Sequence, residues 1–234
     1  MRQLLFRPYS TLRRDSLLNV TPRDLSHIML DIDDVLINTS DIIKEALDEV
    51  CLENELPKLN YISGLPYKNW SNMISKLFME KNQSITSDDI NSEIIQKIQY
   101  RMICKPPDFN DNLANEVAEL KEQGHFCSLI TNNSIDMVDF IFQLYPNFSS
   151  ALFDTVITNS TESAKPSPNA YFSAIESGPD NVNIIGFEHS VAGIFGFLKA
   201  TSMYSSKLFI LVDEPNIGLE QYVNKIAPSR DISF

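Results

Sequence analysis

Five short apolar runs constrain the fold of this chain more than any other feature. Each run has the length and composition of a strand buried inside a parallel sheet. The runs lie at residues 27–31, 126–131, 152–158, 182–187 and 207–212. Between the later runs, apolar spacing and helix-start signals indicate helices at 134–144, 169–176 and 190–199. This alternation predicts an α/β fold, a Rossmann-like parallel sheet with helices on both faces.

The strands are unevenly spaced along the chain. About 90 residues separate the first run from the second, and their pattern is mostly helical. The helical segments lie at residues 40–52, 69–80, 87–102 and 112–123. A crossover back to the sheet requires only the last of them, so the others predict an inserted α-helical cap at 45–105. Residues 1–44 and 106–234 would then form the α/β core.

Polar side chains follow three of the predicted strands. Asp31, Thr131 and Glu188 each stand where an apolar run ends. In open parallel sheets, ligands bind beyond the carboxyl ends of the strands, so one rim would collect these three residues. Asp33 follows Asp31 by two positions, and residues at that spacing on an extended chain point to the same side. Both carboxylates could therefore face one substrate group.

Four short motifs, taken in order, resemble those of haloacid-dehalogenase-superfamily phosphohydrolases. They are "DIDD" at 31–34, "SLITNNS" at 128–134, "SAKPSPNAYFSAI" at 163–175 and "NIIGFEHSVAGIFGFLKA" at 183–200. The resemblance implies that Asp31 is a nucleophile that takes up the phosphoryl group and that Asp33 is the general acid and base. It also implies that Thr131 and Asn132 bind phosphate. Lys165 would neutralise charge between the nucleophile and the phosphoryl group.

The resemblance also implies a divalent cation at this rim. Converging carboxylates repel each other and the substrate, and Mg²⁺, which prefers oxygen ligands, would offset that repulsion. Its ligands would be Asp31, the Asp33 backbone carbonyl and two side chains of the fourth motif, at positions 188 and 189. Glu188 matches the family there, but His189 stands where the family has an Asp. Imidazole suits Mn²⁺ or another transition ion better. Three outcomes stay open: Glu188 suffices for Mg²⁺, the metal preference has changed, or the site is degenerate.

The predicted function is metal-dependent hydrolysis of a small phosphorylated metabolite through an aspartyl phosphate. A cap would close over the site and select the substrate, and Gly64 and Lys68 in "YISGLPYKNW" are candidates for substrate contact. Two alternatives stay open. One is a non-catalytic binding or regulatory protein with a degenerate metal site at His189, and the other is a phosphomutase.

Composition limits the partners of the chain. A net charge of -12 disfavours nucleic acid, and no stretch approaches the ~20 apolar residues of a membrane span. Three widely spaced cysteines indicate reduced thiols, so the cytoplasm is the expected location. The first 14 residues carry four Arg and no acid, which is typical of a mitochondrial transit peptide or of a basic arm packed on an acidic body. The oligomeric state stays open.

Overall fold

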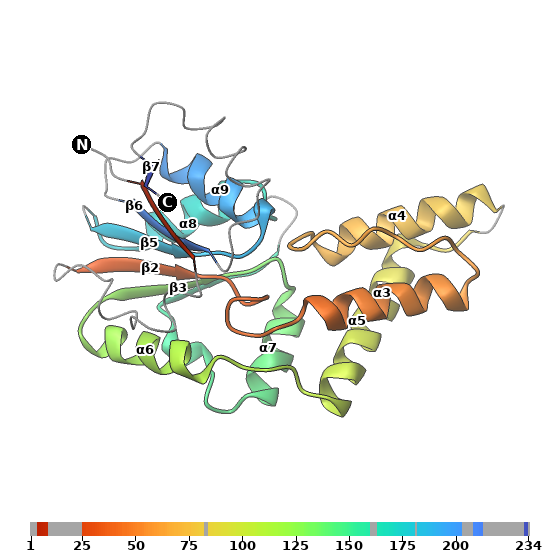
Figure 1. Ribbon diagram of the computed structural model, residues 1–234, viewed down its shortest axis with the longest axis horizontal. Helices are drawn as coiled ribbons and strands as arrows, with labels where there is room; N and C mark the ends of the chain where they lie inside the picture. The colour runs from red at the N-terminus through yellow and green to blue at the C-terminus, as the bar shows by residue number, and fades with distance from the viewer. Residues whose placement is uncertain are drawn as a thin grey trace.

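The computed structural model describes residues 4–8, 25–81, 84–159, 163–180, 182–202, 208–212 and 232–233 (Figure 1). The strands of this part of the chain form one parallel sheet in the order β4-β3-β2-β5-β6-β1-β7. Their bounds are β1 Leu4–Pro8, β2 Ser26–Leu30, β3 Phe126–Ile130, β4 Thr155–Ile157, β5 Asn183–Phe187, β6 Leu208–Val212 and β7 Ile232–Ser233. No helix among the described residues is long and apolar enough to cross a membrane.

The register of the central strands brings their carboxyl ends to the same level. Leu30, the last residue of β2, lies opposite Leu129 on β3 and Phe187 on β5. The backbone amide of Asp31 extends this ladder by donating to the carbonyl of Phe187 at 3.0 Å. The residue that follows each of these strands therefore emerges at one edge of the sheet.

Helices cover both faces of the sheet, which confirms the predicted α/β fold. Alternate residues of β2 serve the two faces: Ile28 and Leu30 belong to one apolar core and Met29 to the other. The first core is completed by α6 (Asp111–Glu122) and α7 (Ile135–Leu144), the second by α8 (Asn169–Ser177) and α9 (Val191–Thr201) (Figure 1). Polar side chains start three of these helices: Asn110, Ser134 and Ser190 each accept a bond from a backbone amide of the first turn.

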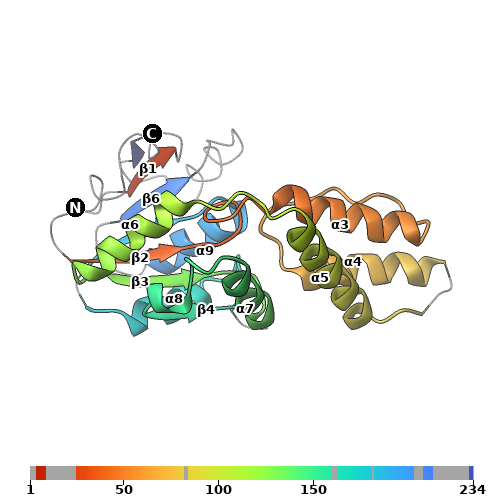
Figure 2. The same ribbon diagram turned by 90° about the horizontal axis from the view of Figure 1, so that it is seen from below.

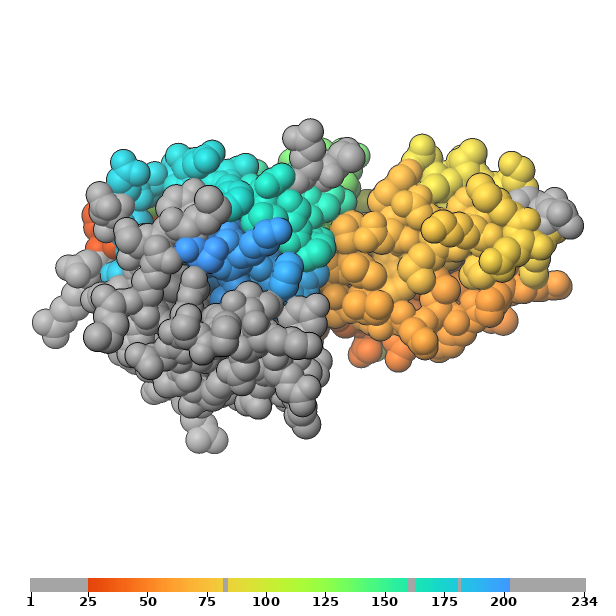
Figure 3. Space-filling view, turned by 90° about the horizontal axis from the view of Figure 1, so that it is seen from above, coloured from red at the N-terminus to blue at the C-terminus, as the bar shows by residue number. Residues whose placement is uncertain are grey.

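Three further helices form a lobe beside the sheet (Figures 2 and 3). This helical lobe, residues 40–104, consists of α3 (Ser40–Glu53), α4 (Tyr67–Glu80) and α5 (Ser87–Cys104). The two segments that join it to the sheet are hydrogen-bonded to each other: Asn38 N donates to Asp108 O at 3.1 Å, and Asn110 N donates to Leu36 O at 2.8 Å. The predicted division between residues 44 and 45 falls inside α3.

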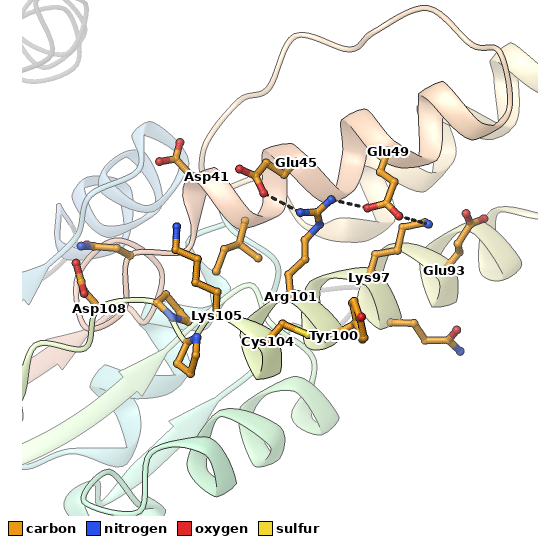
Figure 4. A pocket seen from close by; sticks show the side chains of 15 residues that line it. Asp41, Glu45, Glu49, Glu93, Lys97, Tyr100, Arg101, Cys104, Lys105 and Asp108 are labelled. Carbon is orange, nitrogen blue, oxygen red and sulfur yellow. Dashed lines mark hydrogen bonds and ion pairs between the residues drawn. The ribbon is translucent and has the colours of Figure 1, made fainter.

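Ion pairs hold α3 and α5 together along a groove of about 880 Å³ (Figure 4). Arg101 on α5 donates to Glu45 at 2.8 Å and to Glu49 at 2.5 Å. Lys97, one turn earlier on α5, lies 2.8 Å from Glu49. Since these side chains are partly exposed, each pair stabilises the lobe by no more than about 1 kcal/mol.

The elements differ from the sequence prediction at three places. The predicted strand at 152–158 shortens to β4 because Ser150–Leu152 forms a 3₁₀ turn that buries Phe153 against Phe148. β1 was not predicted: it lies within the basic N-terminal stretch, whose residues 1–3 and 9–14 are outside the described residues. β6 matches the strand predicted at 207–212 except at Lys207, which also lies outside the described residues.

Candidate active site

A buried lysine joins two acids at the carboxyl edge of the sheet. Lys165 Nζ lies 3.0 Å from Asp31 Oδ2 and 2.5 Å from Glu188 Oε1, and all three side chains are buried. Asp31 follows β2 directly and Glu188 follows β5 directly, so the register of the two neighbouring strands sets this approach. The structure thus brings together three of the residues predicted for the site.

Asn132 holds the backbone of Lys165 in place. Its Oδ1 accepts from Lys165 N at 2.8 Å, and its Nδ2 donates to Lys165 O at 3.2 Å. Burial lowers the pKa of Lys165, but Asp31 and Glu188 outweigh that effect, so the pKa lies above its ordinary value. Lys165 therefore carries a positive charge within the site. Asn132 was predicted to bind phosphate, whereas in the structure its side chain holds the backbone of Lys165.

Burial makes the charged form of Glu188 unfavourable. Burial, followed by repulsion from Asp31, raises its pKa to about 8, against the opposing effects of Lys165 and the Tyr171 hydroxyl. Tyr171 on α8 donates to the same oxygen that contacts Lys165. The other oxygen, Oε2, is buried and has no hydrogen-bond partner among the described residues. A Cβ on Gly193 would lie 1.9 Å from that oxygen, so any side chain at this position would displace the Glu188 carboxyl.

Asp33 lies in the same loop with both carboxyl oxygens occupied. Thr39 Oγ1 donates to Oδ1 at 2.6 Å, and Asn133 Nδ2 donates to Oδ2 at 2.9 Å. Burial of the carboxyl, followed by repulsion from Asp31, raises its pKa to about 7, and the two hydrogen bonds oppose the shift. Near neutral pH, a carboxyl of this pKa can both give and take a proton.

Asn133 also connects Asp33 with Thr131. Its Nδ2 lies 3.0 Å from Thr131 Oγ1, and its backbone amide donates to the same hydroxyl at 3.1 Å. Thr131, predicted to bind phosphate, is therefore part of the cluster. Asn133 was missed by the sequence reasoning, although it directly follows Thr131 and Asn132 in the same motif.

The helical lobe reaches this cluster through one short segment. Gly64 O accepts from Asn132 Nδ2 at 2.7 Å, and Tyr67 OH donates to Asn133 Oδ1 at 2.9 Å. Gly64 has a φ of +79°, and a Cβ there would lie 2.3 Å from the Cβ of Ser190. Gly64, predicted as a substrate contact, thus lies in close contact with the core.

Three predicted or missed residues remain to be placed. Lys68 is not brought to the cluster: its ammonium pairs with Asp88 on the exposed side of the lobe. His189 Nδ1 is buried and has no hydrogen-bond partner among the described residues. Tyr171 was missed, because a tyrosine inside a helix six residues after Lys165 carries no distinctive signal in the sequence.

The donor set at the sheet edge fits a magnesium ion with few protein ligands. Among the described residues, no group of three or more His, Cys, Asp and Glu side chains is arranged to hold a metal. Asp31 and Glu188 nevertheless lie close together, since both are within 3.0 Å of Lys165 Nζ. Glu188 Oε2 is buried and has no hydrogen-bond partner among the described residues. Because Mg²⁺ is usually held by one or two carboxylates and several waters, two acids are enough.

Comparison with known proteins agrees with this architecture. No curated protein matches the chain. Among solved structures, a HAD hydrolase, family IA, variant 3 from Entamoeba histolytica HM-1:IMSS has a TM-score of 0.66 at 17% identity, covering 90% of this chain and 92% of that one. A predicted phosphoglycolate phosphatase from Haemophilus somnus 129pt has a TM-score of 0.61 at 15% identity, covering 89% and 94%. These likenesses show the fold.

A third similar structure carries a ligand. CbbY from Rhodobacter sphaeroides in complex with phosphate has a TM-score of 0.58 at 16% identity, covering 80% of this chain and 86% of that one. A mutant of CbbY was solved with xylulose-(1,5)bisphosphate. The sequence profile of haloacid dehalogenase-like hydrolases matches residues 28–186, which is more than half of the chain. The chain therefore belongs to the haloacid dehalogenase-like hydrolase family.

Proposed function

We propose that this hydrolase is a phosphatase that cleaves phosphomonoesters through a phosphorylated Asp31. The observation that carries the proposal is the buried contact of Lys165 with Asp31 at 3.0 Å and with Glu188 at 2.5 Å. An ammonium beside a carboxylate nucleophile offsets the repulsion that an incoming phosphate would otherwise meet. A core built only for stability would gain little from this arrangement, because desolvation of a buried ion pair cancels most of its Coulomb energy.

The two acids of the loop divide the chemistry. A carboxylate oxygen of Asp31 attacks phosphorus, the bond from phosphorus to the leaving oxygen breaks, and Asp33 gives that oxygen its proton. In the second half of the reaction, Asp33 takes a proton from water and the water oxygen bonds to phosphorus. The bond between phosphorus and the Asp31 oxygen then breaks and releases inorganic phosphate. The hydrogen bonds from Thr39 and Asn133 hold Asp33 in one orientation for both transfers.

A divalent cation completes the proposed site. Asp31 and Glu188 would hold Mg²⁺, with the Asp33 carbonyl as the third protein ligand expected from the family. When bound, the ion would neutralise phosphoryl oxygens and so favour attack by an anionic nucleophile. His189 is the position at which a preference for Mn²⁺ or another transition ion would arise.

The small number of buried basic side chains favours hydrolysis over phosphomutase activity. Among the described residues, Lys165 is the one fully buried Lys or Arg. A mutase has to hold a bisphosphate, whose second phosphate needs a cationic partner of its own. Lys68, the basic residue of the lobe nearest in sequence to the contact segment, pairs instead with Asp88. The described residues thus supply one buried cation, which would serve one phosphate.

Hydrolysis of p-nitrophenyl phosphate and a panel of phosphorylated metabolites tests the proposal. We expect release of phosphate with Mg²⁺ or Mn²⁺, none after chelation, and none from Asp31→Asn. Turnover by Asp31→Asn at the wild-type rate would refute the role of Asp31. Failure of the wild type with every metal, together with no thermal stabilisation by Mg²⁺ plus beryllofluoride, would favour the non-catalytic alternative.

A further inference from the structure

We propose that Tyr67 is a positioning residue that orients Asp33 when the helical lobe is seated on the core. The inference rests on the proposed phosphatase function. Tyr67 is the first residue of α4 and is buried, and its hydroxyl donates to Asn133 Oδ1 at 2.9 Å. Asn133 in turn donates to Asp33 Oδ2 at 2.9 Å. A chain of two hydrogen bonds therefore runs from the lobe to the general acid.

The bond from Tyr67 selects one of the two orientations of the Asn133 amide. A side-chain amide has an accepting oxygen and a donating nitrogen on opposite sides, so fixing one end fixes the other. With Oδ1 engaged by the Tyr67 hydroxyl, Nδ2 faces Asp33 and Thr131 Oγ1, at 2.9 and 3.0 Å. The reversed amide would direct its oxygen at the Asp33 carboxylate and repel it.

The two ends of this chain belong to different parts of the molecule. Tyr67 lies in the helical lobe, whereas Asn133 follows β3 in the core. Three residues before Tyr67, Gly64 O accepts from Asn132 Nδ2 at 2.7 Å, and Asn132 holds Lys165. Two consecutive asparagines thus connect the lobe with the Asp33 carboxyl and with the backbone of Lys165. If the lobe moved away, both contacts would break together.

The proposed role makes the effect of Tyr67 depend on the leaving group. Asp33 transfers its proton to the leaving oxygen as the phosphorus–oxygen bond breaks, and a weakly acidic alcohol or phenol needs that proton most. A misoriented Asp33 should therefore lower kcat/KM strongly for phenyl phosphate. It should lower kcat/KM little for p-nitrophenyl phosphate, because nitrophenolate leaves without a proton and kcat/KM reports only the steps through departure of the leaving group. The later attack of water, in which Asp33 acts as base for both substrates, enters kcat alone. A Tyr67 that only supported folding would slow both substrates alike.

Tyr67→Phe is the direct test, since it removes the hydroxyl and keeps the buried ring. We expect kcat/KM for phenyl phosphate to fall about tenfold, with kcat/KM for p-nitrophenyl phosphate changed less than about twofold. Asn133→Ala should show the same selectivity, and adding Tyr67→Phe to it should cost little more. Tyr100→Phe is the matched control: it removes a hydroxyl from an exposed tyrosine of the same lobe and should leave both rates unchanged.

Two results would overturn the inference while leaving the phosphatase function intact. One is an equal loss of kcat/KM on the two substrates, which would make Tyr67 a structural residue or a substrate contact, and the other is an unchanged kcat/KM for phenyl phosphate. If the wild type shows no turnover, an NMR measurement tests the positioning role without activity. In Tyr67→Phe, the side-chain amide protons of Asn133 should shift in the NMR spectrum and exchange faster with solvent, and unchanged signals in a folded variant would refute the positioning role.

Discussion

Replacing Lys165 with Met should destabilise the protein strongly, because it leaves two buried acids facing each other. Lys165 is 1% exposed, and its ammonium lies within 3.0 Å of Asp31 and 2.5 Å of Glu188. Methionine has a similar length and no charge, so the change removes the ammonium and creates little empty space. The two carboxyls would then lose their common partner in a region closed to water.

The magnitude follows from the burial of the pair. Removing one partner of a buried ion pair costs about 3–5 kcal/mol of unfolding free energy. We expect the lower end, about 3 kcal/mol, because burial already raises the pKa of Glu188 to about 8 and a proton offsets part of its charge at pH 7. For a chain of this size, that loss corresponds to a fall of about 6 to 12 °C in the unfolding temperature.

Urea unfolding at pH 7 without added metal measures the effect, and the chain supplies a matched control. Lys68→Met breaks the Lys68–Asp88 pair, whose side chains are 46% and 86% exposed, and should cost less than about 1 kcal/mol. Adding Glu188→Gln to Lys165→Met removes one of the two facing acids and should restore stability. Equal losses in Lys165→Met and Lys68→Met, or a further loss in the double variant, would refute this account of the site.

Three further predictions concern other parts of the molecule. Gly64→Ala would place a Cβ 2.3 Å from the Cβ of Ser190 at a positive φ, so phosphatase kcat/KM should fall about 10- to 100-fold while urea unfolding of the core changes little. Arg101→Met should cost less than about 1 kcal/mol in urea, a loss that high salt removes, because its ion pairs are partly exposed; a larger, salt-independent loss would contradict this. Burial lowers the pKa of His27 to about 4, against the attraction of Asp154. As pH falls from about 6.5 to 4, the unfolded chain takes up a proton first, so wild-type stability should drop by about 3 kcal/mol more than that of His27→Asn.

The sequence predicts that Asp31 and Glu188 lie at one edge of the sheet because local signals and topology agree there. Asp31 and Glu188 each directly follow an apolar run, and parallel strands deliver their ends to one rim. Lys165 was predicted only through the resemblance of its motif to a known family. Its position beside both acids depends on the loop that Asn132 holds, a contact between residues 33 positions apart.

The contacts between lobe and core could not be predicted from the sequence. Tyr67 and Asn133 are 66 residues apart, and their bond depends on how the helical lobe sits on the sheet. Helical periodicity indicates that α4 exists but not which of its residues meets the core. Lys68, the neighbour of Tyr67, was predicted as a substrate contact together with Gly64, because "YISGLPYKNW" resembles a cap loop used for substrate contact. In the structure, Lys68 faces Asp88 and the tyrosine carries the contact.

The concentration of acids at the end of β2 is offset in more than one way. Lys165 supplies one positive charge to Asp31 and Glu188, while Asp33 relies on hydrogen bonds from Thr39 and Asn133. These partners do not fully compensate, because the pKa values of Asp33 and Glu188 stay raised to about 7 and about 8. These shifts arise mainly from burial of each carboxyl and then from repulsion by Asp31, and either a proton or a divalent cation can offset both. A core built only for stability has no need to bear that cost, which supports the proposed role of these acids in binding a metal and moving a proton.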